Sequence, residues 1–87
     1  MTRNYKIAEE LAIGILNVNN ARYDALKERD FESYDKLDTL EVNLKHTLES
    51  FGYEVSLRYD DSPMLYCEEN MAFKAKGVRI REIKEEN

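Results

Sequence analysis

The chain has 87 residues, of which 36% are charged and 43% are hydrophobic, and its net charge is −5 at pH 7. This length leaves room for one domain with one core, and the apolar fraction excludes an intrinsically disordered chain. No apolar run approaches the roughly 18 residues of a membrane-spanning helix, and the lone Cys67 excludes an internal disulfide. The first residues are amphipathic and do not form the apolar stretch of a signal peptide. We therefore expect a cytoplasmic protein without a membrane partner.

A long helix is predicted over residues 4–28. Its apolar side chains recur at helical spacing over about half of the circumference. A face this broad contacts two neighbours, so we expect this helix to be the central element. Asn19 and Arg22 fall inside the apolar half, where a buried guanidinium needs a polar partner. They lie either in water beyond the end of the sheet, or in a polar pairing that fixes the register of a homodimer or another partner.

A second helix is predicted over residues 31–51. Asp30 precedes it as an N-cap, because its carboxylate can accept hydrogen bonds from the free amides of the first turn. Gly52 ends it, because glycine adopts the left-handed backbone conformation without strain. The acidic residues are expected on its outer surface, and the short connection predicts an antiparallel helical hairpin. Its apolar stripe consists of Tyr34, Leu37, Leu40, Leu44, Leu48 and Phe51.

After Gly52 the spacing of apolar residues changes from the helical period to strict alternation, which is typical of half-buried strands. Turn residues such as Pro63 separate the strands. The predicted segments are the strands 53–59, 64–68 and 72–82, followed by a frayed tail over 84–87. The predicted fold is therefore α+β. An N-terminal antiparallel helical hairpin packs on a C-terminal three-stranded antiparallel β-meander, within a single domain over residues 1–87.

The last predicted strand concentrates positive charge in an acidic chain, with Lys74, Lys76, Arg79 and Arg81. The two lysines have one parity and the two arginines the other, so a regular strand would place the pairs on opposite faces. A β-bulge at Gly77 would reset the alternation and bring all four bases onto one face. Such a face would bind an acidic protein or a nucleic-acid backbone. Alternatively, the bases only solubilise an edge strand and discourage pairing with other edges.

Two further surfaces are candidates for partner contacts. The second helix carries an acidic face made of Glu32, Asp35, Asp38 and Glu49. Ile13 and Val42 are predicted on the polar faces of the two helices. Single exposed apolar residues are normal, but two on one hairpin would serve as an oligomer contact.

Enzyme signatures are weak. Glu82-Ile83-Lys84, together with Asp60 and Asp61, has only the outline of a metal-dependent nuclease site. His46 has no predicted nucleophile partner, and one His and one Cys are too few for a structural zinc site. We expect no enzyme, no catalytic or metal-binding residues, and no cofactor.

The sequence favours a small, acidic, non-enzymatic protein–protein interaction module that binds another protein or itself as a homodimer. Its composition is typical of phage and mobile-element accessory proteins. The acidic helix would also suit an inhibitor of a nucleic-acid enzyme, which presents carboxylates where phosphates bind. The alternative is a nucleic-acid-binding protein that uses the basic C-terminal strand.

Overall fold

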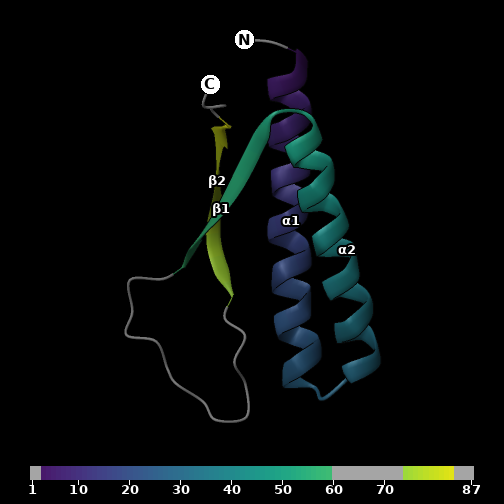
Figure 1. The fold of residues 1–87 in the computed structure, drawn as a ribbon. Coiled ribbons are helices and arrows are strands. Elements are labelled where there is room, and N and C mark those ends of the chain that lie inside the picture. The colour runs from purple at the N-terminus through teal and green to yellow at the C-terminus, as the bar shows by residue number, and fades with distance from the viewer. Residues whose placement is uncertain (1–2, 60–73, 84–87) are drawn as a thin grey trace.

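The computed structural model describes residues 3–59 and 74–83. Its elements in chain order are α1 (Arg3–Lys27), α2 (Phe31–Ser50), β1 (Tyr53–Tyr59) and β2 (Ala75–Glu82). Figure 1 shows α1 and α2 running side by side, with the two strands lying along one side of this helical pair. No helix in these two ranges is long and apolar enough to cross a membrane.

The fold is α+β, as predicted, with an antiparallel helical hairpin followed by a two-stranded antiparallel sheet. Strand β1 pairs directly with β2 along its whole length. In the predicted meander, the strand over 64–68 would lie between the first strand and the last. The direct pairing of β1 with β2 therefore differs from the predicted strand order. Residues 64–68 themselves lie outside the described residues. The strand predicted over 72–82 begins at Ala75.

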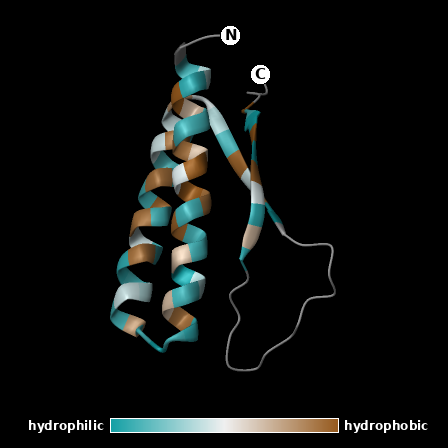
Figure 2. Cartoon of the chain, turned by 180° about the vertical axis from the view of Figure 1, so that it is seen from behind, coloured by the Kyte–Doolittle hydropathy of each residue, from teal (hydrophilic) through white to brown (hydrophobic). Residues whose placement is uncertain are grey.

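Helix α1 is the central element, as its broad apolar face predicts. One side of it contacts α2 and another contacts β2, while α2 also contacts β1. The centre of the core is formed by Ala8, Ile15 and Leu48, all fully buried. Around it pack Leu11, Leu44, Tyr53, Val55, Leu57 and Ile80. A two-stranded sheet is marginally stable by itself, so its apolar side depends on the helices. Figure 2 shows hydrophobic residues interspersed with hydrophilic ones along both strands.

The turn between the helices follows from local backbone chemistry. The amide of Arg29 donates to the carbonyl of Leu26 and that of Asp30 to the carbonyl of Ala25, at 3.0 and 2.8 Å. This is the Schellman pattern that closes a helix, and it holds Arg29 at a left-handed φ of 60°. The carboxylate of Asp30 then accepts a hydrogen bond from the Ser33 amide at 3.1 Å. The predicted N-cap is therefore confirmed.

The hydrogen bonds of this cap also affect the charge of Asp30. They come from the side chain and the backbone amide of Ser33, and they lower the pKa of the Asp30 carboxyl below its ordinary value of 3.8. At the other end of α2, Gly52 has a φ of 93°. This confirms the left-handed glycine that was predicted to end the helix.

A buried ion pair joins the two helices. Glu41 is only 4% exposed, and its Oε1 lies 3.3 Å from Nε of Arg22. The other carboxylate oxygen lies 3.0 Å from Nζ of Lys45, and the Arg22 guanidinium also contacts Asp38 at 2.5 Å. The prediction that all acidic residues of α2 lie on its outer surface is therefore wrong for Glu41. Its spacing from Leu37, Leu44 and Leu48 places it within the apolar stripe, opposite the arginine that needs a carboxylate.

A row of amides extends this polar contact toward the sheet. Arg22 donates to Oδ1 of the buried Asn19 at 3.4 Å, and Asn19 donates to Oδ1 of Asn20 at 3.3 Å. Asn20 in turn bonds the backbone of Ala75 in β2. The prediction that Asn19 and Arg22 lie in water is therefore wrong, since Asn19 is buried and Arg22 has the carboxylate partners that its position within the apolar half requires. Polar residues at the centre of the hairpin thus link α2, α1 and β2.

Candidate functional site

The ladder between β1 and β2 shifts its register once. Arg58 lies opposite Gly77, whereas the next residue of β1, Tyr59, lies opposite Ala75. The ladder therefore skips Lys76, and two residues of β2 occupy one ladder position. An extra residue of this kind is a β-bulge, and it resets the alternation of side chains along the strand.

The reset brings predicted site residues together on the outer face of the sheet. Ala75 is buried and Ile80 packs on the core. These residues are five positions apart, which regular alternation would place on opposite faces. The bases between and beside them, Lys76, Arg79 and Arg81, are all exposed.

A further base on this outer face comes from β1. Arg58 is exposed and alternates with Val55 and Leu57, which pack on the core. The sequence-based set of bases omitted Arg58 because only the last strand was considered, although its parity in β1 was readable. We define the basic sheet face by Arg58, Lys76, Arg79 and Arg81. No helix of the described ranges covers it, since both helices lie on the other side of the sheet.

Lys74 is separated from the basic sheet face. It precedes β2, and its Nζ lies 3.0 Å from the carboxylate of Asp24 in α1. The same ammonium group lies 5.7 Å from the centroid of the Tyr23 ring. The expectation of four aligned bases therefore holds for three of them, because Lys74 interacts with α1.

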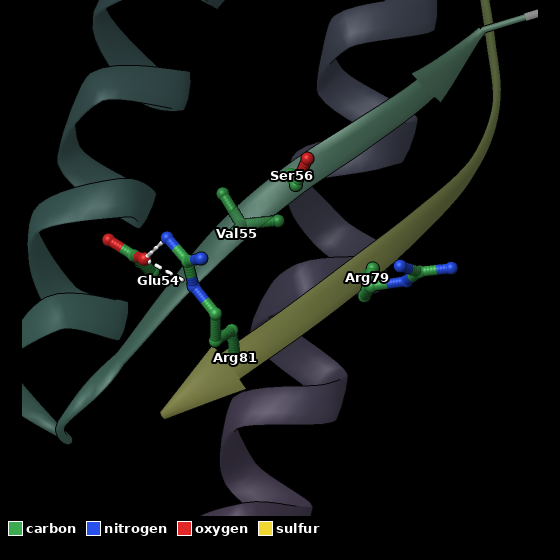
Figure 3. Close-up of a pocket in the computed structure, with 5 residues that line it drawn as sticks. All are labelled: Glu54, Val55, Ser56, Arg79 and Arg81. Atoms are coloured by element: carbon green, nitrogen blue, oxygen red, sulfur yellow. Dashed lines mark hydrogen bonds and ion pairs between the residues drawn. The ribbon is translucent and has the colours of Figure 1, made fainter. Parts of the chain in front are cut away.

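The middle of the basic sheet face is a shallow depression of about 360 Å³, lined by Glu54, Val55, Ser56, Arg79 and Arg81. Arg81 donates to Oε1 of Glu54 from Nε, at 2.6 Å, and from Nη2. Arg79 lies opposite Ser56 in the ladder, and Figure 3 shows its guanidinium pointing away from the Glu54–Arg81 pair. Among the described residues, Arg58 and Arg79 have no hydrogen-bond or ion-pair partner. Two guanidinium groups on this face are therefore available to a partner.

The predicted acidic face of α2 divides into engaged and available carboxylates. Glu32 bonds Lys36 at 3.1 Å within the helix, and Asp38 bonds Arg22 of α1. Asp35 and Glu49 are exposed, and their carboxylates have no partner among the described residues. Two of the four predicted carboxylates are thus paired with bases of the same chain.

The predicted apolar contacts lie on separate helices. Ile13 in α1 is 53% exposed and Val42 in α2 is 44% exposed. Phe31 is 58% exposed, and eleven residues separate it from Val42. Since this is three helical turns, both lie on the side of α2 that carries Asp35 and Glu49. We define the acidic helix face by Phe31, Asp35, Asp38, Val42 and Glu49.

The residues of the weak enzyme signatures are not brought together in the described ranges. Residues 3–59 and 74–83 contain no group of three or more His, Cys, Asp or Glu that could hold a metal ion. His46 is exposed on α2. Asp60, Asp61, Cys67 and Lys84 lie outside the described residues.

Comparison with protein-family models, with curated proteins and with solved structures gives no match, so the functional argument depends on the residues of this chain.

Proposed function

We propose that this protein is a non-enzymatic binding module whose basic sheet face holds an acidic surface of a protein partner. The observation that carries the proposal is the pair of exposed guanidinium groups, Arg58 and Arg79, which have no partner among the described residues. They project from a face that the helices leave uncovered in the described ranges. A guanidinium binds a carboxylate through two parallel hydrogen bonds, and arginine is enriched among the residues that dominate protein interfaces.

The interior of the face supports a protein partner more than a nucleic acid. Glu54 is held by Arg81 at the edge of the depression, where its carboxylate would repel a phosphate and accept hydrogen bonds from a protein. A mixed-charge surface with a small Ser56 at its centre instead resembles the polar parts of protein interfaces.

Nucleic acid remains the second candidate, because a two-stranded ribbon fits the major groove of duplex DNA and the bulge leaves Lys76, Arg79 and Arg81 exposed together. An inhibitor that presents carboxylates in place of phosphates would use the acidic helix face. This third candidate has weaker support, because Asp38 of this face is engaged by Arg22, and the neighbouring Glu32 by Lys36.

The test is fluorescence anisotropy with two labelled probes, a polyglutamate peptide and a short DNA duplex, at low and at physiological salt. We compare the wild type with Arg58→Glu/Arg79→Glu. The control, Lys6→Glu/Lys27→Glu, makes the same charge change on exposed lysines of α1. The proposal requires peptide binding that falls roughly tenfold or more in the sheet variant, the equivalent of about 1.4 kcal/mol, and less than about threefold in the control.

Equal losses in both variants, or no peptide binding at low salt, would contradict the proposal. Tighter binding of the duplex than of the peptide, with a steep salt dependence, would replace it with the nucleic-acid function, since phosphate contacts release counterions. Circular dichroism of each variant checks that the fold is retained.

A further inference from the structure

We infer that the partner of the basic sheet face is a second copy of this chain, which places its acidic helix face on it; the inference rests on the proposed function. The two faces are opposite in charge and belong to the same molecule. Asp35 and Glu49 offer available carboxylates, and Arg58 and Arg79 offer available guanidinium groups. Carboxylates and guanidinium groups bind each other through charge-assisted hydrogen bonds.

The fold prevents one chain from joining its own two faces. On α2, the buried side chains of Glu41 and Leu48 point toward α1 and the sheet. The acidic helix face flanks this contact and is exposed apart from the pairing of Asp38 with Arg22, and the basic sheet face is the side of the sheet that faces away from both helices. The charges of the two faces can therefore meet only between molecules.

The two faces also correspond in the character of their centres. Fourteen residues separate Asp35 from Glu49, which is about 21 Å along a helix. The available bases, Arg58 and Arg79, lie on paired strands two ladder positions apart, about 7 Å along the strand direction, so both fall within the length between the two carboxylates. Val42 lies midway between the two available carboxylates, and the corresponding centre of the sheet face contains Ser56 and Gly77.

Gly77 leaves space for an apolar side chain at that centre. It lies opposite the outward-facing Arg58 in the ladder, and a Cβ added to it would meet no atom within 4 Å. Docking that centres the acidic helix face on the two arginines therefore places Val42, which is 44% exposed in the single chain, over small residues. Charged groups around a small apolar centre are typical of specific protein interfaces.

The symmetry of this association is head to tail. Each chain would give its acidic helix face to one neighbour and its basic sheet face to another, so the contact is heterologous and produces a ring or an open chain. Its mass should rise with protein concentration and fall with added salt, because the contacts are between exposed charges.

The experiment is sedimentation velocity of the full chain over a wide range of concentrations, with two variants. The sheet variant, Arg58→Glu/Arg79→Glu, retains the acidic helix face. The helix variant, Asp35→Lys/Glu49→Lys, retains the basic sheet face. Each variant alone should be a monomer, because one of its two faces repels its counterpart. An equimolar mixture should form a one-to-one heterodimer, since a single intact contact can form.

The mixture distinguishes specific docking from general attraction between charged proteins. Both variants retain a negative net charge, since the wild type carries −5 and the helix variant adds four positive charges. The control mixture joins Lys6→Glu/Lys27→Glu with Glu9→Lys/Glu10→Lys, which change exposed charges of α1. Each control protein should self-associate as the wild type does.

A wild type that stays monomeric at high concentration and low salt would overturn the inference. The peptide-binding assay would then report separately on the proposed function, because an acidic probe can bind a monomer. Self-association that persists in both variants would also overturn it. If Ile13→Asp abolished that persistent association, the contact would lie on α1.

Discussion

The side-chain amide of Asn20 in α1 makes both hydrogen bonds of a strand partner with the backbone of Ala75. The Ala75 amide donates to Oδ1 at 2.8 Å, and Nδ2 donates to the Ala75 carbonyl at 3.1 Å. Ala75 is buried at the start of β2, so its backbone amide and carbonyl need hydrogen-bond partners. The side chain of Asn20 supplies both of them. The contact also fixes the strand one residue before the bulge.

Asn20→Ala should therefore destabilise the protein by about 2 kcal/mol, because two hydrogen bonds are lost and buried backbone groups remain unsatisfied. Urea denaturation measures this difference, and hydrogen exchange should become faster at the Ala75 amide. Asn17→Ala is the matched control, because Asn17 is exposed on the same helix; its effect should stay within about 0.5 kcal/mol. Equal effects of the two substitutions would contradict the role of Asn20.

The buried pair of Arg22 and Glu41 should respond differently to single and double substitution. Arg22→Leu or Glu41→Leu alone removes the pair between the helices and leaves the remaining charge with only its second partner, Lys45 for Glu41 or Asp38 for Arg22, and should destabilise by about 2 kcal/mol. The double substitution should be less destabilising than either one, because it removes both charges of this pair and leaves only the more exposed Asp38 and Lys45. Lys36→Ala breaks only the exposed pair with Glu32, and we expect a change within about 1 kcal/mol. Additive losses in the denaturation experiment would argue against a buried coupled pair.

Two glycines should respond in opposite directions to alanine. At Gly14 a Cβ would lie 3.9 Å from Cδ1 of Leu44, an ordinary contact, so Gly14→Ala should stabilise α1 by about 0.5–1 kcal/mol. At Gly52 the φ of 93° strains any side chain, and Gly52→Ala should destabilise by about 1–2 kcal/mol. Thermal denaturation of both variants checks the prediction. A destabilised Gly14→Ala variant would mean that the helices pack more closely than this distance indicates.

The cap of α2 should make stability depend on acid pH. The pKa of Asp30 is lower in the folded chain than its ordinary value of 3.8, so the ionised cap stabilises the fold above that value. This contribution is lost as the pH falls through the lowered folded pKa. The wild type should therefore be more stable than Asp30→Asn at neutral pH, and the difference should shrink below pH 3.8. A difference that stays constant across a series of urea denaturations from neutral to acid pH would contradict the effect.

Local patterns were sufficient to predict the helices and their ends. The helix predicted over 4–28 is observed at Arg3–Lys27, and the one over 31–51 at Phe31–Ser50. Asp30 and Gly52 act within a few residues of themselves, so their roles were visible in the sequence. The strand over 53–59 is observed with the predicted bounds, because strict alternation is also a local signal.

Contacts between distant segments could not be predicted from local patterns of the sequence. Glu41 was assigned to the surface because of its charge, although its helical position places it against Arg22. Lys74 was grouped with the other bases of its strand, whereas Asp24, fifty residues earlier in the chain, holds it against α1. The pairing of β1 with β2 is likewise nonlocal. In each case the deciding partner belongs to another element, and the pattern of one segment does not identify it.

The bulge at Lys76 has a consequence for how this chain tolerates changes of length during evolution. The ladder skips this residue, so a deletion there would leave a regular strand with Ala75, Val78 and Ile80 still facing the helices. The same holds for Gly77, which shares this ladder position, whereas a deletion from Val78 onward would change which side chains face the helices. Lineages of this protein should therefore gain or lose a residue at the bulge and keep the spacing from Val78 onward constant.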